Sequence, residues 1–255
     1  MKTINIQAIY VLWLREMKRT WRSKSRLIGS MIMPIFFLFL LGTGLSKAAM
    51  PGMPEGMGYI TFLIPGIVGM TLLFSSIFGG LQVLWDKEFG FLKEIMVTPV
   101  SRLSIVLGRM AGGSTTSLIQ GFILLFLSMF IGFHIRTISS FLIAIVFMFI
   151  ISLTFIGLGL AFASRMKDMQ GFQVIMNFVV FPIFFLSGAM FPIQGLPKII
   201  KPLAYINPLT YGIDGLRGTL AGSSAFPIGI DFIVLTVICL VIVSVGSYLF
   251  ETSAI

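Results

Sequence analysis

The stretch 186–217, LSGAMFPIQGLPKIIKPLAYINPLTYGIDGLR, lies between two long apolar runs and carries four prolines, Pro192, Pro197, Pro202 and Pro208. Proline breaks helices because its ring fixes φ and removes a backbone donor. The stretch is therefore not predicted to be one more membrane helix. We expect a folded, broken structure held at a membrane surface.

The composition excludes an ordinary soluble domain. The chain of 255 residues is 57% hydrophobic and 11% charged, whereas soluble domains are about 25% charged. It contains one cysteine, Cys239, and one histidine, His134. A zinc or haem site built from these ligands within one chain is therefore not expected.

The apolar residues form runs long enough to cross a bilayer, which takes about 20 residues. Six runs can be placed: 27–46, 60–84, 104–132, 138–164, 172–191 and 230–250. The predicted fold class is all-α, a polytopic membrane protein with six transmembrane helices in one domain covering 1–255. No carboxylate is expected within the six runs, and the sixth is expected to hold nothing ionisable, which argues against a proton-coupled carrier.

The basic residues predict the orientation. With a cytoplasmic N-terminus, thirteen of the 18 basic residues fall inside, and five fall outside: Lys47, Arg136, Lys198, Lys201 and Arg217. This is the positive-inside bias of proteins in the cytoplasmic membrane. Both termini are then cytoplasmic, and the net charge of +9 does not call for a nucleic-acid partner.

The segment 4–22 has an apolar face with Trp13 and Trp21 and an opposite face of basic residues. This pattern is typical of an interfacial helix lying on anionic lipids of the inner leaflet. The alternative is a cleaved signal sequence with small residues near 46–48, but the basic region and the apolar run are long for one.

The segment 86–102 is predicted to lie in a cytoplasmic loop. Phe91, Leu92, Ile95 and Met96 share one face of a helix there, among charges of both signs. The residues alone leave two interpretations open: a helix resting on lipid, or a helix that docks into a groove of a partner protein.

Two further patterns concern packing and polarity inside the membrane. The spacing Gly108-x-x-x-Gly112 predicts a close helix contact. Gln173 and Asn177 lie in the aromatic-rich fifth run, where such side chains either join helices or face a transport route.

Motifs for catalysis are absent from the sequence. It has no G-x-x-x-x-G-K-[ST] loop and no H-E-x-x-H pattern, and no Gly-x-Ser-Gly element of an intramembrane protease. We expect that the chain is not an enzyme and binds no cofactor of its own.

Two motif stretches carry a family resemblance over the whole chain. The first is Phe185-Leu-Ser-Gly-Ala-Met-Phe-Pro192, followed by Leu196-Pro197, Asn207-Pro-Leu-Thr-Tyr211 and Leu216-Arg217. The second is Glu88-x-Gly90-x-Leu92, followed by Val97-Thr-Pro-Val-Ser-Arg102, with Lys93 where relatives commonly carry glutamate. The chain resembles the membrane subunit of a type-2 ABC exporter, the class of daunorubicin-resistance and polysaccharide-export permeases.

The resemblance implies partners and site residues. It implies two ATP-binding subunits, which hold the ATP and Mg, and a second permease subunit, expected to form a homodimer. The coupling segment to the ATPase would comprise Glu88, Gly90, Phe91, Leu92, Ile95, Met96, Pro99 and Arg102. The route would lie between the two permeases, and we expect the fifth run to line it through Gln173, Asn177, Phe181, Phe184 and Phe185.

The opening stretch is expected to form short re-entrant outer helices within 192–222. Asn207 and Pro208 can begin a helix and Gly222 can end it, with Asp214 and Arg217 paired at i,i+3. By resemblance this would be an outer gate; the alternative is a purely structural plug. The residues assigned to the gate are Pro192, Leu196, Pro197, Asn207, Pro208, Tyr211, Asp214 and Arg217.

Three functions follow from these patterns. The leading one is export of an amphiphilic, drug-like or lipid-like compound, driven by ATP hydrolysed on a partner, since aromatic and methionine-rich walls suit apolar substrates. The second keeps the family but exports a polysaccharide or lipid-linked glycan. The third is a membrane scaffold that docks a cytoplasmic partner and transports nothing.

Overall fold

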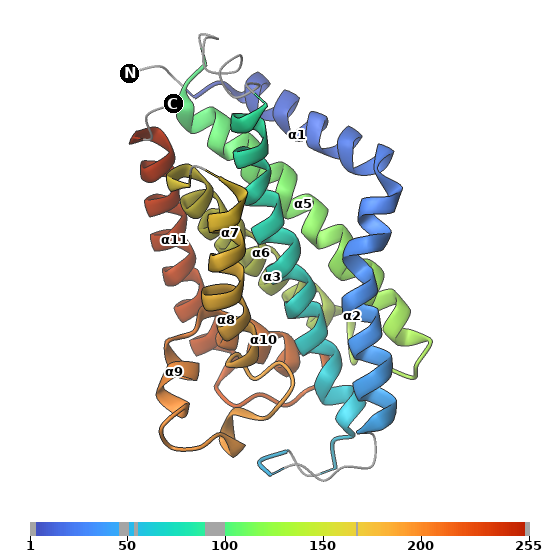
Figure 1. Ribbon diagram of the computed structural model, residues 1–255. Helices are drawn as coiled ribbons and strands as arrows, with labels where there is room; N and C mark the ends of the chain where they lie inside the picture. Colours follow the sequence, from blue (N-terminus) through green and yellow to red (C-terminus); the bar gives the residue numbers. More distant parts are fainter. Residues whose placement is uncertain (1–3, 46–50, 54–55, 90–99, 167, 253–255) are drawn as a thin grey trace.

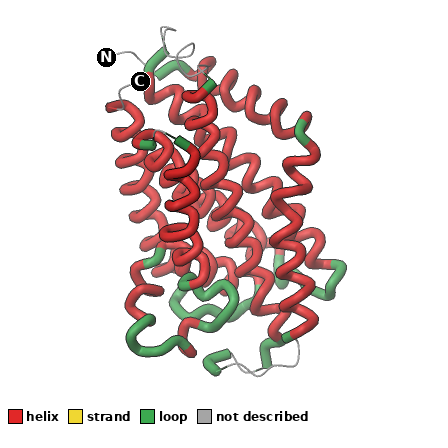
Figure 2. Tube along the Cα trace, viewed as in Figure 1, coloured by secondary structure: helices red, strands yellow, loops and turns green. Residues whose placement is uncertain are grey.

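The computed structural model describes residues 4–45, 51–53, 56–89, 100–166 and 168–252. Within these ranges the chain is helical, with no strand, and its loops lie at the ends of the helices (Figure 2). The elements are α1 (Ile6–Arg22), α2 (Lys24–Gly44), α3 (Tyr59–Glu88), α5 (Arg102–Met129), α6 (Ile138–Arg165), α7 (Met169–Ile175), the π-helix η1 (Met176–Val180), α8 (Phe181–Phe185), the 3₁₀ helix η2 (Ile193–Gly195), α9 (Lys201–Ile206), α10 (Pro208–Leu220) and α11 (Ile228–Thr252). The predicted all-α class is confirmed for the described residues.

Five helices are long and apolar enough to cross a membrane: α2, α3, α5, α6 and α11. The fifth predicted run differs, because its helical path, Met169–Phe185, is only 17 residues long. At about 1.5 Å per residue it measures about 25 Å, short of the roughly 30 Å hydrocarbon core. The prediction that this run extends from 172 to 191 as one helix is therefore wrong at its outer end.

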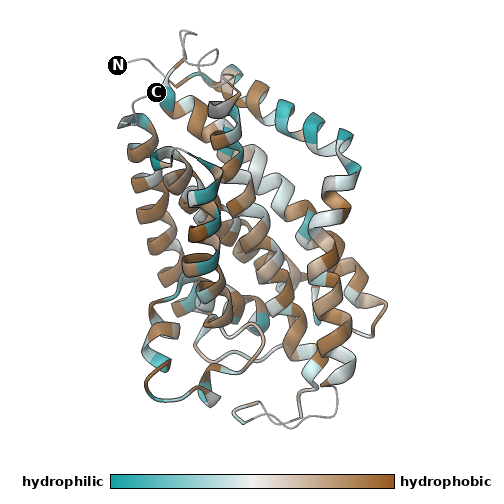
Figure 3. Cartoon of the chain, in the orientation of Figure 1, coloured by the Kyte–Doolittle hydropathy of each residue, from teal (hydrophilic) through white to brown (hydrophobic). Residues whose placement is uncertain are grey.

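The long helices run between two ends of the molecule (Figure 1). One end carries α1, the start of α5 and the last turn of α11, and the opposite end carries α9, α10 and η2. Hydrophobic colours follow the long helices, whereas much of α1 is hydrophilic (Figure 3). This distribution matches the predicted surface helix followed by membrane-embedded helices.

The helix α3 forms the centre of the bundle, packed against α2, α5, α6 and α10. Its apolar side chains, including Leu63, Ile67 and Leu73, are fully buried. A Cβ on Gly80 would lie only 2.5 Å from the backbone carbon of Gly159. Because helices in lipid associate by close packing rather than by hydrophobic burial, such glycines decide where they cross.

The helix α1 packs on α5 through the predicted glycine pair. A Cβ on Gly108 would meet Leu12 at 2.8 Å, and one on Gly112 would meet Glu16 at 2.7 Å. The indole of Trp13 donates to the hydroxyl of Thr115 over 3.1 Å. The expected close contact at Gly108 and Gly112 is confirmed, and its partner is α1.

Candidate functional site

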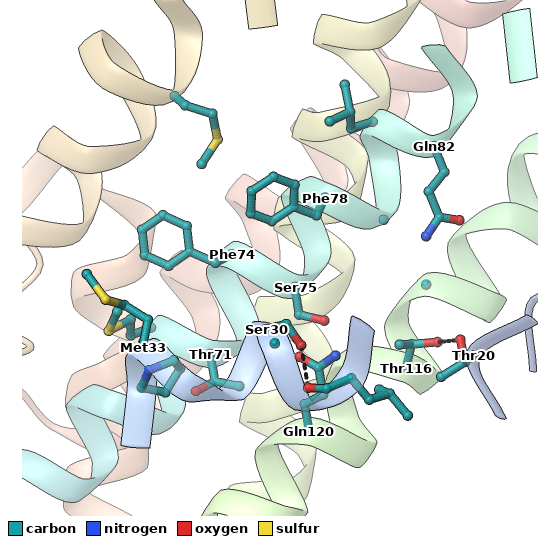
Figure 4. A pocket seen from close by; sticks show the side chains of 18 of the residues that line it. Thr20, Ser30, Met33, Thr71, Phe74, Ser75, Phe78, Gln82, Thr116 and Gln120 are labelled. Atoms are coloured by element: carbon teal, nitrogen blue, oxygen red, sulfur yellow. Dashed lines mark hydrogen bonds between the residues drawn. The ribbon is translucent and has the colours of Figure 1, made fainter. Parts of the chain in front are cut away.

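A cavity of about 530 Å³ lies between α2, α3, α5 and the fifth run, below the C-terminal part of α1. Ligand pockets typically measure 300–1,000 Å³, so the cavity is large enough for a small amphiphile. Its residues from α2 include Ser30, Met33 and Pro34. Figure 4 draws 18 of the lining side chains, and the ten that it labels come from α1, α2, α3 and α5.

The cavity-facing side of α3 carries two stripes. Thr71, Ser75 and Gln82 form a polar stripe, whereas Phe74 and Phe78 form an aromatic one. Residues four apart lie almost directly above one another on a helix, so Thr71 and Ser75 continue one stripe along the cavity, and Phe74 and Phe78 continue the other. In Figure 4 the two rings point away from the hydroxyl of Ser75.

The aromatic stripe meets the fifth run. The ring of Phe74 lies 5.5 Å from that of Phe181 and 5.9 Å from that of Phe184, centre to centre. The ring of Phe184 lies 5.2 Å from that of Phe185. Aromatic pairs at these separations attract one another beyond their apolar burial, so α8 and α3 share one aromatic wall.

The fifth run is interrupted in its middle by the π-helix η1. The N–H of Phe181 reaches back five residues to the carbonyl of Met176. Directly after it comes Pro182, which has no N–H to donate to residue i−4. A proline and a π-turn are usual causes of a helix break, often at functional sites.

The structure separates the residues predicted to line the route. Phe181, Phe184 and Phe185 line the cavity inside the single chain, and their predicted place on a route between two permeases stays a prediction. Gln173 and Asn177 are exposed on the opposite side of the fifth run and do not line it. Their proposed place on a route between two permeases stays a prediction, since one chain does not test it.

The outer segment forms the predicted helix after Asn207. The Asn207 side chain accepts from the N–H of Leu209 over 3.0 Å and donates to the carbonyl of Ile183 over 2.6 Å. Pro208 stands at the first helical position. Gly222, with φ of +79°, ends the helix, and its N–H donates to the carbonyl of Arg217. These predicted caps are confirmed.

Arg217 ties α10 to α3 and to the turn before η2. Its guanidinium donates to the carbonyl of Phe62 over 3.3 Å and to that of Gly188 over 2.8 Å. It also lies 3.7 Å above the ring of Phe62. Burial lowers the pKa of Arg217 to about 10, so it remains a cation at neutral pH, held by carbonyls and a ring.

Asp214 has a different main role from the one predicted. Its pairing with Arg217 is present but long, at 3.9 Å. The shorter contacts are to the N–H groups of Ala225 and Phe226, which its carboxylate accepts at 2.8–2.9 Å. Burial raises the pKa of Asp214, and these two bonds act in the opposite direction. Asp214 therefore fixes the loop between α10 and α11.

The remaining gate residues are spread over the outer surface. Pro192 is buried, Leu196 is half-buried and Pro197 is exposed. The hydroxyl of Tyr211 donates to the carbonyl of Tyr205 over 2.7 Å, which joins α10 to α9. The structure thus places the eight predicted gate residues in one segment, and their role as a gate between two copies stays a prediction.

The prediction that the sixth run holds nothing ionisable is wrong at Asp231. This residue lies in the first turn of α11 and is fully buried. Among the described residues, neither oxygen of its carboxyl group has a hydrogen-bond partner. Asp231 stands inside the run 230–250 in the sequence itself, so the prediction overlooked it; its burial depends on the folded bundle, which sequence hydropathy does not reveal.

The predicted coupling residues Gly90, Phe91, Leu92, Ile95, Met96 and Pro99 lie outside the described residues, and the structure describes only the backbone of Glu88. At the start of α5, the Arg102 guanidinium donates to the carbonyl of Glu251 in α11. Asp86, which opens this segment in the sequence, is buried and pairs with Arg109 and, at 3.4 Å, with Arg15. The helices on both sides of the segment are thereby linked to α1, α5 and α11.

Sequence reasoning missed the cavity itself and the Asp86–Arg109 pair. The polar and aromatic stripes of α3 were visible as a four-residue spacing from Thr71 to Ser75 and from Phe74 to Phe78. That spacing shows a two-faced helix, but not what lies across from each face. The pairing of Asp86 with Arg109 depends on the crossing of α3 and α5.

Comparisons with known proteins give consistent matches. A family model described as "ABC-2 type transporter" matches residues 7–221. The ycf38 protein of Cyanophora paradoxa is 27% identical over 220 residues, covering 86% of this chain and 76% of its own length. Nodulation protein J of Rhizobium leguminosarum bv. viciae is 26% identical over 238 residues, covering 91% and 89%. The inner membrane transport permease YadH of Escherichia coli K12 is 23% identical over 231 residues, covering 90% and 89%.

Proposed function

Since the chain belongs to the ABC-2 type transporter family, we propose that it is the membrane subunit of an ATP-driven exporter of amphiphilic, drug-like or lipid-like compounds. The observation that carries this proposal is the cavity of about 530 Å³ among the apolar helices α2, α3 and α8. A mostly apolar pocket with a few polar groups is the usual form of a small-molecule site. ATP hydrolysis is assigned to a separate ATP-binding subunit, present in two copies.

The proposal includes six membrane crossings with both termini in the cytoplasm. In Figure 1 the run Met169–Phe185 continues from the end of α6 toward the end that holds α10. Its 17 residues would cross the bilayer with the turn 186–193 completing the thickness. Non-helical backbone at such depth needs cover by protein, and Gly188, Ala189 and Met190 are buried.

A second copy of the chain is the proposed partner within the membrane. The side of the fifth run that faces away from the bundle carries Phe178, which is 78% exposed, and Val174, which is 56% exposed. Gln173 and Asn177 are also exposed on this side. A polar and aromatic surface of this kind suits a helix interface, where membrane amides form bonds between helices. A crosslinker at Asn177 is expected to capture the second copy or substrate, and capture of lipid alone would count against this face.

The segment 86–102 is the proposed contact with the ATPase. Support comes from its two flanks, where Asp86 is bound by Arg109 and Arg15, and Arg102 bonds to the end of α11. A force on the segment would therefore reach several helices at once. Glu88→Lys and Leu92→Asp are expected to reduce co-purification of the ATPase while the membrane domain stays folded. Unchanged co-purification with both variants would contradict the proposed contact.

The decisive experiment is transport in vesicles that hold the chain with its ATPase. Ser30→Trp fills the cavity from an exposed position on α2, and Leu240→Trp is the matched control on the exposed side of α11. We expect Ser30→Trp to abolish amphiphile-stimulated ATPase activity and ATP-dependent export, and Leu240→Trp to retain both. A chain that docks the ATPase but never shows stimulation or export would be a scaffold instead.

A further inference from the structure

The cavity has a polar wall made of uncharged groups. Gln82 of α3 and Gln120 of α5 line it and are only 3% and 5% exposed. Thr71 and Thr116 lie on the same wall, 2% and 7% exposed. In Figure 4 Gln120, Ser75 and Thr71 all appear on the side away from the Phe78 ring.

The two amides on this wall have bonding capacity left over. Within the part of the chain that the structure describes, neither the Gln82 nor the Gln120 side chain makes a hydrogen bond to a protein group. A glutamine amide carries two donors and an acceptor, and buried polar groups are normally paired. The hydroxyl of Thr71, by contrast, donates to the carbonyl of Ile67 over 2.9 Å.

Among the described residues, the lining holds no unpaired charge that could bind a charged ligand. Its one ionisable side chain, Glu16, lies 3.0 Å from the guanidinium of Arg19. Because burying an unpaired charge costs far more than burying a hydrogen-bonded neutral group, a cation or anion would be disfavoured here. The opposite wall consists of the rings of Phe74, Phe181 and Phe184.

We propose that the substrate class is an uncharged amphiphile whose polar part carries hydroxyl or amide groups, as in an acylated sugar. The polar part would bond to Gln82 and Gln120, while the apolar part would lie on the aromatic wall. This inference rests on the proposed function, because it names what the exporter carries. Neither a drug-like cation nor an anionic lipid would be preferred by this cavity.

The test compares three photoreactive probes with the same dodecyl chain and a terminal diazirine: a maltoside, a trimethylammonium and a sulfate. Labelling is measured without ATP, in phosphatidylcholine vesicles that hold the complex with its ATPase. We expect the maltoside to label the peptides that contain Met33 and Phe74 at least about 5-fold more than either charged probe. Gln82→Leu and Gln120→Leu should each reduce that labelling about 3- to 10-fold, the loss of roughly one neutral hydrogen bond.

Gln170→Leu is the matched control, because Gln170 is exposed at the start of α7 and does not line the cavity. Gln120→Glu provides a second variant that keeps the size of the side chain, and we expect it to shift the preference toward the trimethylammonium probe. Equal or stronger labelling by a charged probe in the unaltered protein would overturn the inference. So would unchanged maltoside labelling in both leucine variants, since the amides would then bind water only. If export persists in either case, the proposed function stands while this inference fails.

Discussion

The helix α10 and the fifth run are joined by a short outer segment, yet the protein holds them in opposite ways. In α10 ten of 13 residues are buried. In Met169–Phe185 only Phe172, Met176, Val180 and Phe184 are buried, four of 17 residues. α10 is fixed by Arg217, Asp214 and the Asn207 cap, whereas the fifth run rests on α3 mainly through aromatic rings.

This difference bears on what the outer segment can do. Directional bonds to α3, α8 and the 225–226 backbone require α10 to move together with its neighbours. Aromatic contacts allow sliding, and a π-turn can shift position along a helix. We infer that the fifth run is the adaptable wall of the cavity and that α10 is its fixed support.

The largest effect is expected from Arg217→Met. The change removes donors from the carbonyls of Phe62 and Gly188 and leaves Asp214 without its nearby cation. Breaking a buried charge network typically costs about 3–5 kcal/mol. Unfolding in detergent measures the loss, and Arg22→Met on the exposed side of α1 should stay within roughly 0.5 kcal/mol. Equal stability of the two variants would contradict the fixed support.

A smaller effect is expected where α3 touches the segment directly. A Cβ on Gly66 would lie 2.8 Å from the carbonyl carbon of Ala189. Gly66→Ala should therefore lower the unfolding midpoint, by about 1–3 kcal/mol for an overpacked contact. Gly229→Ala, with open space around it, is the control for the general effect of glycine replacement. If both variants unfold together, α3 and the turn are not in close contact.

The contributions of the two hydrogen bonds made by the Asn207 cap of α10 can be separated. Asn207→Ala removes both the bond from the N–H of Leu209 and the bond to the carbonyl of Ile183. Loss of a cap costs about 1 kcal/mol. Asn207→Asp keeps the capping oxygen and loses the second bond alone, so it should fall between the native protein and the alanine variant. An aspartate variant as unstable as alanine would show that the link to α8 dominates.

The smallest effect on stability is expected from a change on the exposed face of the fifth run. Phe178 is 78% exposed on η1, so Phe178→Ala should change the stability of one chain by less than roughly 0.5 kcal/mol. If this face meets a second copy, the variant should nevertheless weaken association, as measured by light scattering in detergent. Phe184→Ala, at a buried position of the same run, is the positive control for unfolding. A strongly destabilised Phe178→Ala monomer would remove the contrast between the two regions.

Several features of the outer helix were predictable because they are local. Asn207, Pro208 and Gly222 set the ends of α10 through bonds within a few residues. The fully buried face of Leu209, Ile213, Leu216 and Leu220 follows from helical spacing. The partners of Arg217 were not predictable, since Phe62 lies 155 residues away in the chain.

The residues that line the cavity likewise include some that are close in sequence and some that only folding brings together. Phe181, Phe184 and Phe185 stand together in the aromatic run of the sequence, whereas Gln82 and Gln120 come from helices that meet only in the folded bundle. The exposure of Gln173 and Asn177 depends on the turn of the helix around η1. A one-residue change in register, which hydropathy does not detect, moves a side chain about 100° around the axis.

The sequence by itself determined the helical class, the long apolar helices, the amphipathic helix α1 and the caps of α10, because each rests on composition or on contacts within a few residues. The tertiary structure alone decided that the proline-rich stretch is bound to α3 through Arg217, and that α3 and α5 together face the aromatic wall with unpaired amides. These contacts join residues more than a hundred positions apart or on different helices. They depend on how glycines such as Gly66 and Gly80 let backbones approach, and close packing of that kind is a property of pairs of helices rather than of either sequence segment.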